Sequence, residues 1–256
     1  SGKGHAHPQA TIYRNKAITR SFHLGTMSKY TVVKEEAVVK QTIDIPFTSS
    51  CIIGCGVMTG FGSAINAAQV KAQSSCAIIG CGGVGLNVIQ GCKIAGASKI
   101  IAIDINKERL EKARDFGATH VIQSTKEEVN LSKTKMKILD LTEGRGTDYA
   151  FECTAIPELG AAPLNLIRNA GMAIQVSGIE QSISFDCELF EWNKVYLNPL
   201  YGNCNPQREF HKIQQLYKSG QLKLDELISK TYSLEELSIA FEDMLAGRIS
   251  KGVIVF

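Results

Sequence analysis

The chain has 256 residues, and its 28 lysines and arginines against 25 aspartates and glutamates give a net charge of +3. These charges are interspersed along the sequence, so no surface for nucleic acid or another polyanion is predicted. Hydrophobic residues make up 44% of the chain, which is enough for the core of a large α/β domain.

Two apolar segments, near residues 51–68 and 76–97, are broken by glycines and polar residues. Neither segment is therefore expected to span a membrane, and no signal peptide is predicted. The eight cysteines lie mostly inside apolar runs and include no C-x-x-C pair. This usage favours reduced, buried thiols and a cytoplasmic protein.

The first part of the chain has little regular pattern. Residues 1–20 are polar and are predicted to form a loop, whereas residues 30–33 and 37–39 are predicted to form two short strands. A linker at Pro46 then leads into the apolar run CIIGCGVMTGFGSAINAA.

The segment from Ser75 to Asp104 has the pattern strand, glycine turn, helix, strand. Short apolar runs at 76–79 and 100–103 predict the two strands, and the second of them leads directly to Asp104. Between them, Gly80, Gly82 and Gly85 have the spacing G-x-G-x-x-G. The helix is predicted because apolar side chains share one face at i, i+3, i+4 spacing, namely Val88, Ile89, Cys92 and Ala95.

Each residue of this pattern suits a dinucleotide. Gly80 permits the turn, Gly82 lets the backbone approach a pyrophosphate, and Gly85 lets the helix pack closely on the strand. The helix N-terminus attracts the phosphates, and Asp104 is placed to accept hydrogen bonds from both ribose hydroxyls. A 2′-phosphate would be repelled there, so NAD(H) is predicted rather than NADP(H). The glycines alone would fit an ordinary αβ turn, but their complete context favours the dinucleotide site.

The remaining elements predict an α/β fold with a doubly wound parallel sheet. Further strands are expected at 119–122, 149–152, 172–176 and 195–200, separated by helical stretches. Residues 206–217 are expected to be helical, and a second helix begins at a capping box formed by Ser233 and Glu236. A final strand is expected at 252–256.

Several consecutive motifs resemble the zinc-containing alcohol dehydrogenases of the medium-chain dehydrogenase family. They are FHLGTMSKYTVV, GCGVMTGFGSAI, GCGGVGL, DINKERLEKARDFGATHVI and LTEGRGTDYAFECT, in the family's order. The resemblance implies a remnant of the GroES-like catalytic domain at 1–56, an NAD-binding Rossmann domain at 57–200, and a return to the catalytic domain at 201–256. The catalytic domain would then be partial, mainly β, and formed by the two chain ends.

The resemblance also implies a catalytic zinc, for which Cys55 matches one ligand; Cys55 and Thr59 are therefore the candidate catalytic residues. A cysteine in an apolar run is also compatible with a buried thiol. The family's other Cys and His ligands and its proton relay have no counterpart, so the chain is expected to begin downstream of them. Ser1, Gly4 and His7 stand where the lobe of the structural zinc has cysteines, and no structural zinc is expected; a disordered terminus is the alternative. His23 is expected to be a packed, hydrogen-bonded ring.

Other positions match the family's coenzyme contacts. The resemblance places Thr59 and Val84 on either side of the nicotinamide, and Val176, Ser177 and Tyr201 at its carboxamide. It places Arg109 near the adenosine ribose and Lys251 near the pyrophosphate, although both would also suit solvated surface charges. Cys153, after Glu152 at the end of a strand, is interpreted as a core thiol. The full set of expected cofactor-binding residues is Gly80, Gly82, Gly83, Val84, Gly85, Asp104, Arg109, Val176, Ser177, Tyr201 and Lys251.

The function implied is NAD-dependent hydride transfer between a small alcohol or aldehyde and NAD, with zinc as the Lewis acid in the intact family. With one zinc ligand, this chain is expected to be incomplete for catalysis. Two alternatives stay open: a truncated, non-catalytic NAD-binding paralogue, and a zinc-free member similar to quinone reductases. A homodimer is expected through the strand at 195–200, which would otherwise be an exposed edge.

Overall fold

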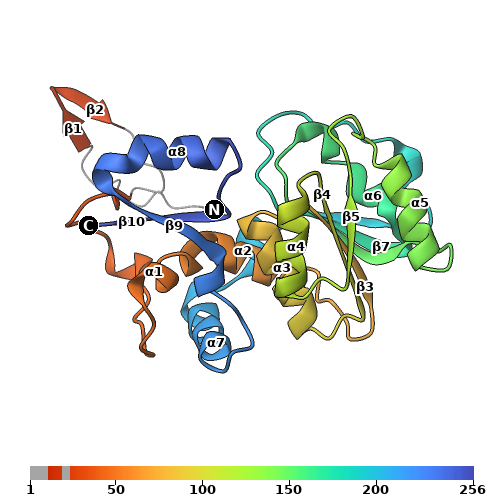
Figure 1. Ribbon diagram of the computed structural model, residues 1–256, viewed down its shortest axis with the longest axis horizontal. Coiled ribbons are helices and arrows are strands. Elements are labelled where there is room, and N and C mark those ends of the chain that lie inside the picture. The colour runs from red at the N-terminus through yellow and green to blue at the C-terminus, as the bar shows by residue number, and fades with distance from the viewer. Residues whose placement is uncertain (1–10, 19–23) are drawn as a thin grey trace, which may run out of the picture. The chain divides into compact units, whose positions relative to one another are not determined.

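The structure is a computed structural model that describes residues 11–18 and 24–256. The chain divides into two compact units. The larger unit is Thr42–Ile228, and the smaller one combines Ser1–Gln41 with Ser229–Phe256. The two units are described separately below, and Figure 1 labels their elements.

A six-stranded sheet forms the centre of the larger unit, in the order β5-β4-β3-β6-β7-β8 (Figure 1). Its neighbouring strands are all parallel. The strands are β3 (Ser75–Ile79), β4 (Lys99–Asp104), β5 (His120–Gln123), β6 (Thr147–Glu152), β7 (Ile167–Gln175) and β8 (Val195–Leu197). The expected doubly wound parallel sheet is confirmed. Because the strand order reverses between β3 and β6, their carboxyl ends flank the crevice where such sheets bind ligands.

Helices cover both faces of this sheet. Helices α3 (Gly83–Ile94) and α4 (Lys107–Phe116) lie on one face, and α5 (Ser132–Leu141) and α6 (Ala162–Leu166) on the other (Figure 1). Helix α4 begins where the Asn106 side chain accepts hydrogen bonds from the backbone N–H groups of Glu108 and Arg109. It ends at Gly117, whose φ of 119° suits a left-handed C-terminal residue.

The strands are apolar because both faces of the sheet are buried. Residues 76–79 of β3 and 100–104 of β4 are buried throughout. On one face, Ile79, Ile101 and Ile103 pack in a single cluster with Ile138 of α5 and Leu164 of α6. This continuous apolar layer holds the carboxyl ends of the strands in place.

A continuous helical run, Phe47–Ala67, precedes the sheet. It comprises α1 (Phe47–Ser50), α2 (Met58–Gly62) and two π-helical turns. By length and composition alone this run could cross a membrane, but 61% of its apolar 18-residue window is buried inside the protein, as in a core helix. After β8, the helix α7 (Pro206–Lys218) confirms the helix expected at 206–217.

The smaller unit contains two pairs of short strands. Strands β1 (Thr11–Tyr13) and β2 (Lys16–Ile18) form an antiparallel hairpin, and β9 (Ile228–Ser233) pairs with β10 (Lys251–Val255). Helix α8 (Leu237–Leu245) lies between β9 and β10 in sequence and follows the expected capping box of Ser233 and Glu236. The predicted box is confirmed, because both of its hydrogen bonds are present.

Several local predictions were wrong. Residues 11–18 form the hairpin rather than a loop, because Arg14 and Asn15 both have positive φ and so complete a two-residue turn. The strands predicted at 30–33 and 37–39 are absent, and a short 3-10 helix, Glu35–Ala37, extends into the second of these ranges. Strand β8 ends at Leu197 rather than at residue 200, because the chain turns into a 3-10 segment, Leu200–Asn203.

Candidate functional site

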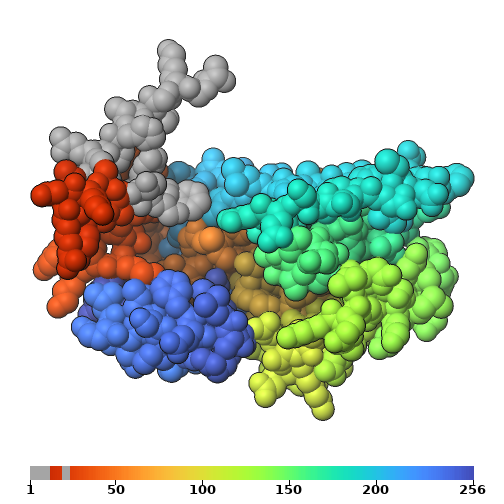
Figure 2. All heavy atoms as spheres, turned by 90° about the horizontal axis from the view of Figure 1, so that it is seen from above, coloured from red at the N-terminus to blue at the C-terminus, as the bar shows by residue number. Residues whose placement is uncertain are grey.

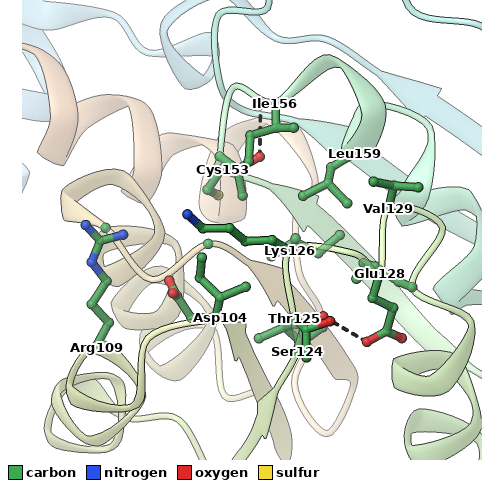
Figure 3. Close-up of a pocket in the computed structure, with 17 residues that line it drawn as sticks. Asp104, Arg109, Ser124, Thr125, Lys126, Glu128, Val129, Cys153, Ile156 and Leu159 are labelled. Atoms are coloured by element: carbon green, nitrogen blue, oxygen red, sulfur yellow. Dashed lines mark hydrogen bonds between the residues drawn. The ribbon is translucent and has the colours of Figure 1, made fainter. Parts of the chain in front are cut away.

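A cavity of about 410 Å³ opens at the carboxyl ends of the strands in the larger unit (Figure 3). Gly80 and Gly82 line it after β3, Asp104 and Arg109 after β4, and Thr154 after β6. Its size lies within the range of small-molecule sites. The sheet therefore brings the predicted glycine turn, aspartate and arginine to one cavity.

Asp104 is fixed by two backbone hydrogen bonds. Its Oδ2 accepts from the Cys81 N–H at 2.7 Å, and its Oδ1 accepts from the Asn106 N–H at 2.9 Å. The residue is only 7% exposed, and it joins the glycine turn after β3 to the end of β4. Since a carboxylate has about four acceptor positions, each oxygen of Asp104 keeps the capacity to accept a further hydrogen bond.

The glycine turn depends on close approach of backbone atoms. A side-chain carbon added at Gly85 would lie 1.9 Å from the Gly80 carbonyl oxygen, so the first turn of α3 requires glycine there. Gly80 itself has a φ of 90°. At Gly82 an added carbon would have no neighbour within 4 Å. The space beside Gly82 is thus open for a ligand to approach the backbone.

A loop after β5 forms another wall of the cavity, and the sequence prediction missed it. Figure 3 shows Lys126 extending across the cavity, with Ser124 and Val129 on the same loop. Ser124 donates to Glu128 at 2.9 Å, and the Thr134 backbone N–H donates to Glu128 at 2.6 Å. Burial alone would raise the pKa of Glu128, but these hydrogen bonds lower it. The position of Ser124, just after a parallel strand, was a signal that could have identified this wall.

Glu152 is the last residue of β6 and is fully buried. One carboxylate oxygen accepts from the Thr154 N–H and hydroxyl, both at 2.5 Å, and the other accepts from the Ser177 hydroxyl. The Glu152 carbonyl oxygen accepts from the N–H groups of Val176 and Ser177, at 2.9 and 3.2 Å. The two predicted residues after β7 are thus tied to the end of β6.

The thiols near the cavity are poor nucleophiles. Burial raises the pKa of Cys81 above its ordinary range, and the Asp104 carboxylate raises it further. Burial also raises the pKa of Cys153, with an added contribution from Glu152. The raised pKa disfavours the reactive thiolate form of both cysteines. Cys153, predicted to be a core thiol, is only half-buried and lies on the cavity wall.

Thr59 and Val84 come from two helices in close contact. A carbon added at Gly60 of α2 would lie 2.4 Å from the Val84 carbonyl oxygen in the first turn of α3. The segment that carries Tyr201 also packs on α2, since a carbon added at Gly202 would lie 2.7 Å from the Thr59 carbonyl oxygen. Thr59, Val84 and Tyr201 are therefore close to one another along α2.

Cys55 is an exposed residue of the π-helical turn Ile53–Val57. The Tyr201 hydroxyl donates to the Gly54 carbonyl oxygen at 2.7 Å, and burial raises the pKa of Tyr201 to about 12, with smaller contributions from Cys204 and Cys55. Within residues 11–18 and 24–256, no three His, Cys, Asp or Glu side chains come together as metal ligands. The donors around Cys55 in the described chain thus do not fit a zinc ion.

The remaining sequence predictions concern residues other than those of the cavity and of α2. Lys251 begins β10 in the smaller unit and is half-buried. Ser1, Gly4, His7 and His23 lie outside the described residues. All eight cysteines are free, but Cys51, Cys55 and Cys187 are exposed, which corrects the expectation that the thiols are buried. None of these three lies in a strand: Cys51 follows the short helix α1, Cys55 lies within the π-helical turn Ile53–Val57, and Cys187 begins a 3-10 helix, Cys187–Phe190.

Comparison with known proteins identifies relatives over most of the chain. Residues 83–216 match the family model "Zinc-binding dehydrogenase". The chain is 35% identical over 246 residues to alcohol dehydrogenase 6 of Rattus norvegicus, which covers 94% of this chain and 64% of that protein.

Solved structures agree with this assignment. Benzyl alcohol dehydrogenase from Acinetobacter calcoaceticus superposes with a TM-score of 0.78 at 32% identity, covering 84% of this chain and 59% of that one. A zinc-binding-domain alcohol dehydrogenase from Burkholderia ambifaria gives 0.79 at 29%, covering 88% and 60%. The chain therefore spans less than two thirds of the length of these relatives. By its matched domain, its sequence and its fold, the chain belongs to the zinc-binding dehydrogenase family.

Proposed function

We propose that the larger unit binds NAD(H), and that the chain is the coenzyme-binding part of an oxidoreductase of the alcohol dehydrogenase type. The observation that supports this most directly is the Asp104 carboxylate, fixed at the end of β4 beside the open space at Gly82. The substrate class proposed is a small alcohol or its aldehyde, by analogy with the relatives' names.

Asp104 selects the nucleotide in this proposal. Its remaining acceptor positions suit the two hydroxyls of an adenosine ribose, whereas a 2′-phosphate would meet a like charge. The N-terminus of α3, at Gly83, Val84 and Gly85, offers backbone N–H groups and a partial positive charge to the pyrophosphate. Arg109 borders the same cavity and contributes positive charge near the ribose.

We assign the nicotinamide end of the coenzyme to the β6 side of the sheet, across from Asp104 at the end of β4. The switch point between them is the place where the strand order reverses, between β3 and β6. Thr59 and Val84 would enclose the ring, and the backbone at Val176, Ser177 and Tyr201 would bind its carboxamide. When bound, nicotinamide supplies the hydride acceptor or donor for alcohol–aldehyde interconversion.

The test is titration of the purified chain with NADH and NADPH, followed by nicotinamide fluorescence. Asp104→Asn removes the negative charge but keeps the side chain's size, so NADH affinity is expected to fall about tenfold while NADPH affinity does not fall. The matched control is Asp115→Asn, an exposed position on α4, which is expected to leave both affinities unchanged. If neither nucleotide binds the wild-type chain, or if Asp104→Asn leaves NADH affinity unchanged, the proposal is wrong.

The donors around Cys55 favour a second candidate, an NAD(H)-binding chain without zinc-dependent turnover. One exposed thiol in the described residues cannot complete a tetrahedral zinc site. Metal analysis of the protein used for the NADH titration separates the two candidates. Stoichiometric zinc with alcohol turnover supports the dehydrogenase, whereas NADH binding without zinc or turnover supports the second candidate.

We further propose a homodimer and a cytoplasmic location. Strand β8 is an edge of the sheet, and Val195 on it is 45% exposed, so a second copy could continue the sheet there. The eight free cysteines suit a reducing compartment. Size-exclusion chromatography coupled to light scattering tests the dimer, and a monomer at high concentration would count against it.

A further inference from the structure

Glu152 is a buried carboxylate whose hydrogen-bond donors are all neutral. Its side chain is fully buried, and its oxygens accept from Thr154 and from the Ser177 hydroxyl. None of the ion pairs in the described part of the chain includes it. A buried charge without a cation is costly. The cost of burying this carboxylate therefore points to a specific function for Glu152.

The same residue connects three strand ends. Thr154, which Glu152 holds through two hydrogen bonds, packs against the glycine turn after β3, 2.7 Å from a carbon added at Gly80. On the other side, the Glu152 backbone and carboxylate bind Val176 and Ser177 after β7. Glu152 thus fixes the ends of β3, β6 and β7 relative to one another.

We propose that Glu152 is a positioning residue for the nicotinamide half of the coenzyme, an inference that rests on the proposed NAD(H) site. Asp104, which would hold the adenosine half, lies at the end of β4, and β4 and β7 are on opposite sides of the β3–β6 pair. A dinucleotide that starts at β4 and crosses the switch point must end over β6 and β7. Glu152 holds the backbone there and shares no hydrogen bond with Asp104.

Positioning depends on the reach of the side chain rather than on its charge, and two substitutions separate these properties. In Glu152→Gln, the amide oxygen can accept from both Thr154 donors, while the amide nitrogen donates to the Ser177 oxygen. Glu152→Asp keeps the charge but is one methylene shorter, so it cannot bridge Thr154 and Ser177 in the same way. Glu152→Gln is therefore the conservative variant, and Glu152→Asp is the disruptive one.

The experiment is calorimetric titration of both variants with NADH and with ADP-ribose, which lacks the nicotinamide. Glu152→Asp is expected to weaken NADH binding by about tenfold and to change ADP-ribose binding by less than about twofold. Glu152→Gln is expected to bind both ligands about as well as the wild type. Retained ADP-ribose binding also reports that the variant is folded.

Three results would overturn the inference. Equal weakening of NADH and ADP-ribose in Glu152→Asp would assign Glu152 to general stability. Loss of NADH affinity in Glu152→Gln would assign the effect to charge, and unchanged NADH affinity in Glu152→Asp would show that the bridge is not needed. If the wild-type chain binds neither ligand, the proposed NAD(H) site itself fails, which is a distinguishable result.

Ser177→Ala is the second variant in case Glu152→Asp does not fold. It removes only the hydroxyl that donates to Glu152, at a half-buried position. NADH affinity is expected to fall about threefold, again with unchanged ADP-ribose affinity. Unchanged NADH affinity in Ser177→Ala would also contradict the proposed link between β6 and β7.

Discussion

Two segments of the chain that contain β-branched residues differ in burial and in secondary structure. Residues 76–79 of β3 are buried throughout, and Ile78 has no exposed surface. Residues 24–41 contain the similar runs Thr31-Val32-Val33 and Ala37-Val38-Val39, yet Val32 is 91% exposed. The larger unit, which contains β3, has a dense core, whereas this part of the smaller unit has almost none. Composition alone does not decide whether a segment becomes a strand.

The difference lies in the neighbours of each segment. Strand β3 is hydrogen-bonded to β4 on one side and to β6 on the other. In the described part of the chain, no strand pairs with residues 30–39. An unpaired strand leaves its backbone groups and apolar side chains in water, so this segment adopts bends and the short helix Glu35–Ala37 instead. Figure 2 draws all heavy atoms as spheres, and the atoms of the larger unit, orange to light blue, form a continuous surface over much of the face in view.

The largest expected effect comes from the same kind of truncation in the two segments. Ile78→Ala leaves a cavity between the sheet and its helices, and it should lower the free energy of unfolding by about 3 kcal/mol. Val32→Ala removes an exposed side chain and should change it by less than about 0.5 kcal/mol. Urea denaturation followed by circular dichroism measures both values. Comparable losses in the two variants would contradict the contrast between the segments.

The sheet could be predicted from the sequence because the local patterns agree with the strand pairing that stabilises β3. Apolar runs, glycine turns and helical periodicity between 75 and 176 are local signals, and each agrees with the long-range parallel pairing. The glycines and Asp104 were predictable too, because their spacing along the chain fixes their place at one sheet edge. The strand predictions at 30–39 failed because the local pattern of apolar residues does not reveal whether a neighbouring strand is available for pairing.

Other features depend on contacts that sequence spacing does not encode. The wall formed by Ser124 and Lys126 follows from the loop path after β5. The link from Glu152 to Ser177 joins residues 25 positions apart in the sequence. The hairpin turn at Arg14 and Asn15 was missed because neither residue is the glycine that usually marks such a turn.

The second prediction concerns the other end of the smaller unit, which has internal polar contacts of its own. Asp243 accepts hydrogen bonds from Tyr232 at 2.7 Å, Arg248 at 2.7 Å and Lys230 at 3.2 Å. The Tyr232 hydroxyl, then the Arg248 and Lys230 side chains, lower the pKa of Asp243 from its ordinary 3.8 to about 2. Because the unfolded chain binds the proton more readily, this stabilisation is complete above pH 4. It is lost as the pH falls from about 4 to about 2.

The amide NMR signals of β9 and β10 measure this loss during a titration from pH 5 to pH 2. They should lose dispersion before the signals of β3 and β4 do. Asp243→Asn is the control, because it has no carboxylate to protonate and should show no transition of its own in that range. If wild type and Asp243→Asn lose structure along the same curve, the carboxylate does not stabilise this end of the chain.

The smallest expected effect tests whether α8 depends on its own capping box. The Ser233 side chain accepts from the Glu236 backbone N–H in the 3-10 turn Leu234–Glu236, which leads directly into α8, and the Ser233 backbone N–H donates to the Glu236 side chain at 2.9 Å. Ser233→Ala leaves that turn's N–H without its partner and should cost about 1 kcal/mol. Ser238→Ala, on the exposed surface of α8, should be neutral or slightly stabilising, since alanine is the better helix former. Hydrogen exchange of the α8 amides distinguishes the two, because only Ser233→Ala should speed exchange in the helix. Equal exchange in both variants would mean that α8 is stabilised by packing rather than by its cap. In that respect this part of the smaller unit would resemble the larger unit and differ from residues 24–41.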